Sequence, residues 1–275
     1  MKLRTITEAL LALLPCTASM AQAPVCDDLT PEQKVVAQQV MTSYYPYACC
    51  DDTISACLTS EPSCKLPKLL ASEACRMAAV GKSAKDIKHV FDQRALSMSP
   101  HTPPVRIEMR PEHVWGNPEA KTIVSIYLCG RCPYCSRHVP AFIEALEKSS
   151  LKDRVAVNLR LFPIKTHENS TQAALGVEAA AQMGQGWPFL LKIYKNFDQY
   201  TNDSMMTWAG ELGLDKVKFD AWYKNPAVRD YVVASKKEGF VNQVESTPTF
   251  FLNGHKIQGA FDVDSLLSMI EEVTD

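Results

Sequence analysis

The sequence predicts an α/β domain with an inserted helical subdomain, preceded by a small, cysteine-rich, all-helical domain. Three observations support this prediction. Six cysteines lie in the first third of the chain, among segments with helical periodicity. Proline-rich residues 99–104 then interrupt the pattern, and favour an extended linker. Beyond them, over residues 105–275, short β-rich runs are followed by longer helical segments, as expected of an α/β domain.

The composition is that of an ordinary globular protein. The chain has 275 residues, of which 46% are hydrophobic and 22% charged, and its formal net charge is −2. This charge supplies neither the basic surface typical of nucleic-acid-binding proteins nor a polybasic membrane patch. We therefore expect no nucleic-acid partner.

Residues 1–23 have the pattern of a signal peptide. A positive start with Lys2 and Arg4 precedes a mostly apolar stretch at 9–14, and Ala21-Gln22-Ala23 fits a cleavage site. An amphipathic first helix is the alternative interpretation. A signal peptide implies a periplasmic or otherwise exported protein, in a compartment where disulfides persist.

Residues 24–98 are predicted to form a small helical domain. Three helices are expected: one after the capping sequence Thr30-Pro31-Glu32-Gln33, one from about Pro67 to Val80, and one capped by Ser83 and Asp86. Such a domain has a thin core, so each well-placed disulfide would add about 2–4 kcal/mol of stability. Six cysteines are available, and their fifteen possible pairings remain open: Cys26, Cys49, Cys50, Cys57, Cys64 and Cys75.

The remaining elements follow from local patterns. Strands are predicted at 105–109, 122–128, 154–162, 249–252 and 256–258, the last two joined by a turn at Asn253-Gly254. Helices are predicted from Pro133 onward and at 264–273. Four further helical segments predict an insertion at about 171–239: 173–183, 189–197, 205–212 and 217–233.

Three cysteines at three-residue steps, Cys129, Cys132 and Cys135, form two overlapping CxxC motifs. Cys132 lies directly before a predicted helix, where free backbone N–H groups and the helix dipole favour the thiolate. The thiolate is the nucleophile in disulfide exchange. We therefore expect Cys132 to be the attacking residue. Cys135 lies one turn inside the helix and is suited to resolve a mixed disulfide, whereas Cys129 ends a strand.

The second part of the chain resembles the DsbA-like and DsbC/DsbG-like thiol–disulfide oxidoreductases of the thioredoxin superfamily. The resemblance covers about residues 105–275. The residues that support it are Pro111-Glu112-His113-Val114-Trp115-Gly116-Asn117, Cys132-Pro133-Tyr134-Cys135, Pro140, Phe162-Pro163 with His167, and Thr247-Pro248-Thr249-Phe250-Phe251-Leu252-Asn253-Gly254. It implies a thioredoxin-like fold that contains the helical insertion.

The resemblance also implies a cis peptide bond between Thr247 and Pro248, facing the cysteines, where a client chain would pair with the backbone. The implied partners are cysteine-containing exported proteins and a membrane or soluble redox partner that resets the cysteine pair. Many relatives have a buried carboxylate six residues before the nucleophile, but this chain has Ile126 there. Together with Pro133-Tyr134 and Thr247, this favours the isomerase and reductase side of the family.

Four further residues are candidates for tuning the site. Cys129 is either a packed small hydrophobe or a regulatory or alternative resolving thiol. Arg131 would stabilise the Cys132 thiolate or remain an exposed loop charge, and Tyr134 lies between the two cysteines. His138 would tune Cys135 from the next turn or be a solvated helix residue. The histidines show no metal-binding spacing, so no dedicated metal site or cofactor is expected.

Two other functions remain open. One is a chaperone-like or cytochrome c maturation partner-binding module with a secondary redox role, because residues 69–98 resemble the helical domain of CcmH-type proteins, although they lack its CxxC. The other is binding of a soft metal by the clustered thiols.

Overall fold

The computed structural model describes residues 26–60, 64–98 and 103–275. The predicted signal peptide at 1–23 and most of the predicted linker at 99–104 lie outside the described residues. The predicted fold class is confirmed, since a thioredoxin-like α/β domain follows a disulfide-bonded helical region. The domain boundaries at 98, 104 and 239 stay predictions.

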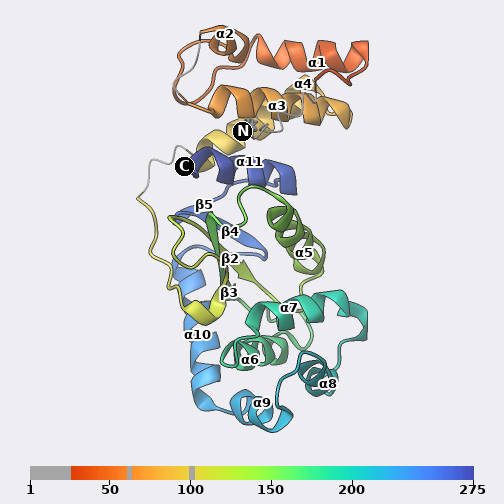
Figure 1. Ribbon diagram of the computed structural model, residues 1–275, viewed down its shortest axis with the longest axis vertical. Coiled ribbons are helices and arrows are strands. Elements are labelled where there is room, and N and C mark those ends of the chain that lie inside the picture. Colours follow the sequence, from red (N-terminus) through yellow and green to blue (C-terminus); the bar gives the residue numbers. More distant parts are fainter. Residues whose placement is uncertain (1–25, 61–63, 99–102) are drawn as a thin grey trace, which may run out of the picture.

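A five-stranded sheet in the order β1-β3-β2-β4-β5 forms the centre of the α/β domain (Figure 1). Central β2 and β3 are parallel and the other pairs are antiparallel. The strands are β1 (Val114–Gly116), β2 (Thr122–Leu128), β3 (Val155–Leu161), β4 (Thr249–Leu252) and β5 (His255–Lys256). The predictions of β2, β3 and β4 are confirmed, because short runs that are buried on both faces and rich in β-branched residues mark such strands well.

The β4–β5 hairpin turns at Asn253 and Gly254, as predicted. Both residues have positive φ angles, 49° and 84°, which a two-residue hairpin turn of the primed type requires. The last strand is shorter than the predicted 256–258. The Ile257 N–H still donates to the Phe250 carbonyl of β4, and the next N–H, that of Gln258, points away from β4 and donates to the Ser97 hydroxyl of the helical domain at 2.8 Å.

The prediction of a strand at 105–109 is wrong. The segment is extended, but its polar groups find isolated partners and no ladder forms. The Val105 N–H donates to the Gly254 carbonyl at 2.9 Å. The Glu108 N–H donates to the Glu238 carboxylate at 2.8 Å, and the Asn158 amide donates to the Glu108 carbonyl at 2.9 Å. Alternation of apolar and polar residues therefore marked an extended chain that lies over the sheet.

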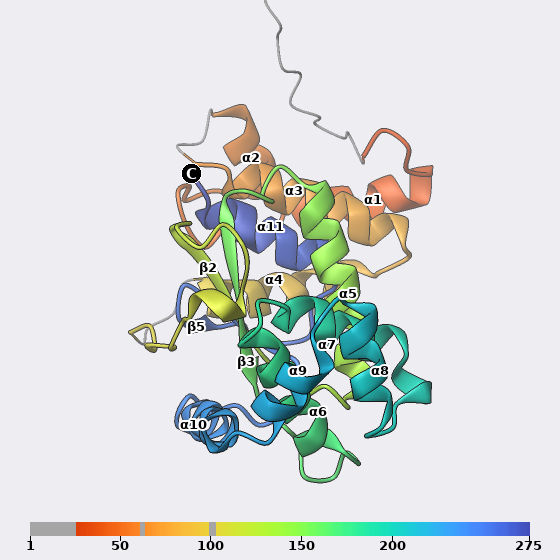
Figure 2. The same cartoon turned by 60° about the horizontal axis from the view of Figure 1, so that its bottom comes forward.

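Helices cover both faces of the sheet. Figures 1 and 2 show α5 (Pro133–Lys148) on one side and α10 (Pro226–Val241) on the other. α11 (Val263–Val273) packs against α5. The buried side chains of α5 recur every three or four residues, which fixes this helix on the sheet with its first turn at the end of β2: Cys135, Val139, Phe142, Ile143 and Leu146.

The helical insertion joins β3 to β4 and lies at the end of the molecule opposite the N-terminal helices (Figure 1). The prediction of one continuous helix at 217–233 is wrong, because two helices occupy this segment. Pro226 has no N–H to donate and therefore begins a new helix, capped by the Asn225 side chain, which accepts from the Ala227 N–H at 2.9 Å. The insertion comprises α6 (Ser170–Ala181), α7 (Gly186–Lys195), α8 (Ser204–Glu211), α9 (Lys216–Tyr223) and α10.

The N-terminal region contains the three predicted helices and one more, α2, which is too short to show a helical period. The capping box of α1 is confirmed, since the Thr30 hydroxyl accepts from the Gln33 N–H at 3.3 Å and the Gln33 side chain accepts from the Thr30 N–H at 2.9 Å. The helices are α1 (Pro31–Met41), α2 (Ile54–Thr59), α3 (Leu66–Ala79) and α4 (Ala84–Met98).

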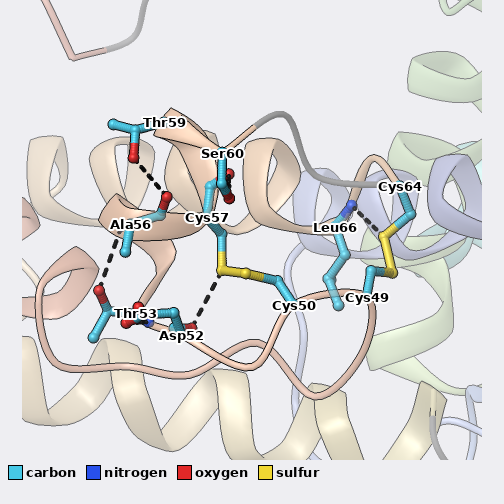
Figure 3. The surroundings of a disulfide bond; sticks show 10 residues. All are labelled: Cys49, Cys50, Asp52, Thr53, Ala56, Cys57, Thr59, Ser60, Cys64 and Leu66. Atoms are coloured by element: carbon cyan, nitrogen blue, oxygen red, sulfur yellow. Dashed lines mark hydrogen bonds between the residues drawn. A yellow bond between two sulfur atoms is a disulfide. The ribbon is translucent and has the colours of Figure 1, made fainter.

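Three disulfides staple these helices: Cys26–Cys75, Cys49–Cys64 and Cys50–Cys57. Figure 3 shows how the last two use the adjacent Cys49 and Cys50 to tie one loop to α2 and to the start of α3. All six of these cysteines are paired, and the three thiols of the later cluster are free.

A buried charged residue joins the helical region to the α/β domain. Arg94 of α4 is 0% exposed. Its guanidinium lies 2.6 Å from the Glu73 carboxylate of α3 and 2.8 Å from the Glu272 carboxylate of α11. It also donates to the Ser268 hydroxyl at 2.8 Å. The charge is thereby compensated on both sides of the interface, which fixes the helical region against α11.

Candidate active site

The three free thiols lie where β2 ends and α5 begins. Cys129 follows the last residue of β2, and its carbonyl accepts from the Cys132 N–H at 3.1 Å, which closes a tight turn. Cys132 is the N-cap of α5, as predicted, and Pro133 takes the first helical position. All three thiols are at least 98% buried. The sharp turn between strand and helix thus places the downstream pair over the positive end of α5.

The Cys132 thiol is an acid of unusual strength. Its pKa falls to about 5, chiefly because the Cys135 thiol donates a hydrogen bond to it. The Thr247 side chain and the backbone N–H groups of Cys135 and Tyr134 also lower this pKa, and together these effects exceed the opposing effect of burial. Cys132 is therefore a thiolate at neutral pH, the form that attacks disulfides.

Cys135 behaves in the opposite way. Burial raises its pKa well above the ordinary value, and the neighbouring Cys132 sulfur raises it further. The two sulfurs thus form an asymmetric pair, a stabilised thiolate at the helix N-terminus and a protonated thiol one turn inside. Such an asymmetry suits one sulfur to attack a disulfide and the other to resolve the mixed disulfide.

Thr247 and Pro248 reach this pair from the start of β4. Their peptide bond is cis, as the resemblance implied. The Cys132 thiol donates to the Thr247 carbonyl at 3.2 Å. In the described part of the chain the buried Thr247 hydroxyl has no hydrogen-bond partner, so it is free to donate to the Cys132 thiolate, whose pKa it lowers.

Tyr194 of α7 is a site residue that the sequence did not reveal. Its buried hydroxyl donates to the Cys129 carbonyl at 3.2 Å and lies close to the Cys135 sulfur. Burial, and then the proximity of the Cys135 sulfur, raise the Tyr194 pKa well above its ordinary value, so the hydroxyl stays protonated. No local motif links this residue to the cysteines, because it reaches them only through the packing of α7 of the insertion against α5.

The other predicted tuning residues are dispersed around the pair. The Arg131 guanidinium turns toward the insertion, where it donates to the Phe197 carbonyl at 2.6 Å and lies over the rings of Phe197 and Tyr200. The Tyr134 side chain is 60% exposed, while its backbone N–H serves Cys132. His138 is exposed on the next turn of α5. Whether these side chains tune the thiols stays a prediction.

Cys129 lies beside the pair but in a different environment. It is 1% exposed, and burial raises its pKa. Its sulfur is 3.5 Å from the Nδ1 atom of His167, the histidine of the Phe162-Pro163 segment that the resemblance included. These contacts fit a packed thiol. They also place the His167 imidazole where it could assist Cys129 if that thiol were reactive.

A groove opens between the first two turns of α5 and the segment that follows β5, and Thr247 on its wall contacts the Cys132 sulfur. Its volume is about 630 Å³, and its walls contain both Tyr134 and the Thr247-Pro248 bond. Much of the lining is apolar and half-exposed, including Phe250, Ile257 and Phe261. The arrangement suits an extended chain with apolar side chains that passes the sulfur of Cys132.

Ile126, where many relatives have a carboxylate, is fully buried in β2 opposite Phe250 of β4.

Metal binding receives no support from the geometry. Among residues 26–60, 64–98 and 103–275, no three His, Cys, Asp or Glu side chains are grouped as metal ligands would be. The three clustered thiols are therefore not arranged as a metal site in this part of the chain.

Comparison with known proteins agrees with this geometry. A family model described as Thioredoxin matches residues 108–272, more than half of the chain. The chain belongs to the thioredoxin family. The match includes both cysteines of the downstream pair and the Thr247-Pro248 bond, and its limits agree with the resemblance predicted over about 105–275.

Solved structures confirm the fold of this thioredoxin-family chain. A thioredoxin-like oxidoreductase from Silicibacter pomeroyi DSS-3 superposes with a TM-score of 0.51, at 24% identity, over 59% of this chain and 92% of its own. The thiol-disulfide exchange protein alpha-DsbA2 from Wolbachia pipientis superposes with a TM-score of 0.52, at 18% identity, over 70% of this chain and all of its own. At these identities the likeness shows the fold alone.

Curated relatives match the same region. The Na(+)/H(+) antiporter NhaA of Herminiimonas arsenicoxydans is 27% identical over 169 residues, which are 62% of this chain and 26% of that protein. The chain thus spans about a quarter of the length of the curated relatives it matches. Their name refers to the whole of a much longer protein. Among its described residues, no helix has both the length and the apolar character needed to cross a membrane.

Proposed function

We propose that this chain is an exported thiol–disulfide oxidoreductase that exchanges disulfides with cysteines of other proteins through Cys132 and Cys135. The observation that supports this most directly is the asymmetric pair, a thiolate with a pKa of about 5 beside a buried thiol of raised pKa. Both sulfurs are held at the start of α5 by the family fold. Three disulfides in the helical region support an oxidising, exported location.

The exchange proceeds in two steps. The Cys132 thiolate attacks one sulfur of a client disulfide, forming a mixed disulfide and releasing one client thiolate. Cys135 then loses its proton and attacks the Cys132 sulfur, which releases the second client thiol. The client gains two electrons and the cysteine pair loses two. The reverse sequence oxidises a client dithiol, and a separate redox partner resets the pair in either case.

The groove gives the client its place. An extended client segment would pass along Phe250, Ile257 and Phe261 and pair with the backbone at Thr247, 3.2 Å from the Cys132 sulfur. Partners are accordingly exported proteins with exposed cysteines and neighbouring apolar residues.

Two sets of observations bear on direction. Pro133-Tyr134, Thr247 and Ile126 favour the isomerase and reductase side. The low pKa of Cys132 favours oxidation, since a stabilised thiolate stabilises the reduced pair. The reduction potential of the pair, measured against glutathione, separates the two directions: a value of about −270 mV supports reduction of clients, and one of about −120 mV supports their oxidation.

A Cys132→Ser variant tests the proposed function. It should lose insulin reduction and refolding of scrambled disulfides, whereas Cys129→Ala should retain both. If Cys132→Ser kept both activities and Cys129→Ala lost them, the nucleophile would be Cys129, which contradicts the assignment.

The alternative is a chaperone-like or cytochrome c maturation partner-binding module, and the apolar groove is the feature that favours it. A pure binding module would hold an unfolded client equally well after alanine replaces both cysteines. An exchange enzyme would lose covalent capture of the same client.

A further inference from the structure

We propose that the cysteine-rich helical region positions one wall of the groove beside Cys132, with Arg76 as the main positioning residue, and so controls affinity for client chains. This inference rests on the proposed function, since it takes the groove as the client site. The wall in question is the segment from Lys256 to Val263, between β5 and α11.

This wall has little regular structure of its own. It supplies Ile257, Phe261 and Val263 to the groove, yet it contains neither helix nor strand between Lys256 and the start of α11. One ladder-like hydrogen bond, from the Ile257 N–H to the Phe250 carbonyl at 2.9 Å, ties it to β4. Its shape therefore depends on what lies behind it.

α3 holds the end of the wall that leads into α11. The Arg76 guanidinium lies 2.7 Å from the Asp262 carboxylate and donates to the Ser265 hydroxyl at 2.8 Å. Asp262 is also the N-cap of α11, where its side chain accepts from the Ser265 N–H at 2.9 Å. Arg76 thus fixes both the cap of α11 and the last residues of the wall.

α4 holds the other end. The Ser97 hydroxyl accepts from the Gln258 N–H at 2.8 Å, which satisfies the first backbone donor beyond the hairpin ladder. Gly259 follows with a φ of 86°, and a Cβ atom there would lie 3.1 Å from Cβ of Gln93. The backbone of the wall is therefore in direct contact with α4.

The helical region is built to act as a rigid support. Disulfide Cys26–Cys75 fixes α3 at the residue before Arg76. Glu73, one turn earlier, pairs with buried Arg94 of α4, so the two supporting helices are linked by charge. The groove lining within the described ranges comes from the α/β domain alone. The helical region therefore acts on a client through the wall and not by touching it.

This geometry separates two kinds of substrate. A client chain lies along the wall, so a loosened wall must be ordered again on binding, and affinity falls. Glutathione needs only the Cys132 sulfur and the adjacent backbone. Loss of Arg76 should therefore raise the KM for a peptide and leave exchange with glutathione unchanged.

Arg76→Gln tests the proposal, with Arg229→Gln, an exposed residue of α10, as the matched control. The substrates are a ten-residue apolar peptide in a disulfide with a fluorescent thiol, and oxidised glutathione. We expect Arg76→Gln to raise the peptide KM about three- to tenfold, with kcat changed less than about twofold. The rate with glutathione and the reduction potential of the pair should match the wild type.

Asp262→Asn supplies a second, independent test, because asparagine keeps the helix cap but removes the ion pair. It should raise the peptide KM as Arg76→Gln does, and the double variant should add nothing further. An unchanged peptide KM in both variants overturns the proposal, as does equal slowing with glutathione. A wild-type chain that exchanges with neither substrate would instead overturn the proposed function.

Discussion

The Cys132 thiol donates a hydrogen bond to the carbonyl oxygen of Thr247 at 3.2 Å. This contact joins the first turn of α5 to the residue before β4, two segments far apart in the sequence. When Cys132 loses its proton, the carbonyl no longer has a donor to accept from and is available to a client backbone. Under the proposed function, the same residue contacts the attacking sulfur and offers a backbone partner to the client chain.

The first prediction concerns the pH dependence of Cys132. Its pKa is lowered from an ordinary value near 9 to about 5, so alkylation by iodoacetamide should rise with pH about a midpoint near 5 and be level by pH 7. The pKa is depressed in the folded state, so the thiolate adds stability that is full above pH 9 and is lost as pH falls through 5. In Cys132→Ser, labelling below pH 7 should be absent, since burial raises the pKa of both other thiols.

Thr247→Val should raise the Cys132 pKa by about 0.5–1 unit, because the variant removes one hydroxyl donor to the thiolate and keeps the side-chain shape. The ultraviolet absorbance of the thiolate, followed against pH, measures this shift. Thr122→Val is the matched control, a buried threonine at the opposite end of β2 that bonds to Thr274. Equal midpoints in the wild type and Thr247→Val would exclude the hydroxyl from the site.

Tyr194→Phe should slow resolution of the mixed disulfide about three- to tenfold, because it removes a hydroxyl beside Cys135 that can turn from the Cys129 carbonyl to donate to the forming Cys135 thiolate. The measurement is the decay of a Cys132–peptide mixed disulfide after rapid mixing. Attack by Cys132 should keep its wild-type rate. Tyr223→Phe, a half-buried tyrosine of the same insertion, is the control. Slower attack with normal decay would contradict the role given to Tyr194.

Arg94→Ala should destabilise the chain by about 3–5 kcal/mol, because it leaves the Glu73 and Glu272 carboxylates uncompensated at a buried interface. Urea unfolding followed by circular dichroism measures the change. Lys224→Ala removes an exposed ion pair with Asp220 and should change stability by less than about 1 kcal/mol. Equal effects of the two variants would show that the buried pair has no structural role.

Much of the fold could be predicted from local patterns. The capping box at Thr30, the buried run at 122–128 and the Asn253-Gly254 turn each depend on residues close in sequence, and each was correct. The errors arose where a distant partner decides the outcome. Residues 105–109 look like a strand but bond to a turn and a side chain, and beyond the last strand the Gln258 N–H bonds to Ser97 of the helical region.

The site could be predicted only in part, for the same reason. Cys132 as a helix N-cap follows from the strand, the cysteine motif and Pro133, which are contiguous. Tyr194 belongs to the insertion, and its contact with the Cys129 carbonyl depends on how α7 packs on α5. Arg76 was not singled out, because its partner Asp262 lies on the other side of the domain interface.

The central claim, that Cys132 attacks and Cys135 resolves, is tested most directly by trapping. A Cys135→Ser variant is mixed with a peptide disulfide at pH 7, quenched with acid and digested, and the peptide adduct is located by mass spectrometry. We predict a stable adduct on Cys132 in this variant, and rapid loss of the same adduct in the wild type. An adduct on Cys129, or none on any of the three cysteines, would contradict it.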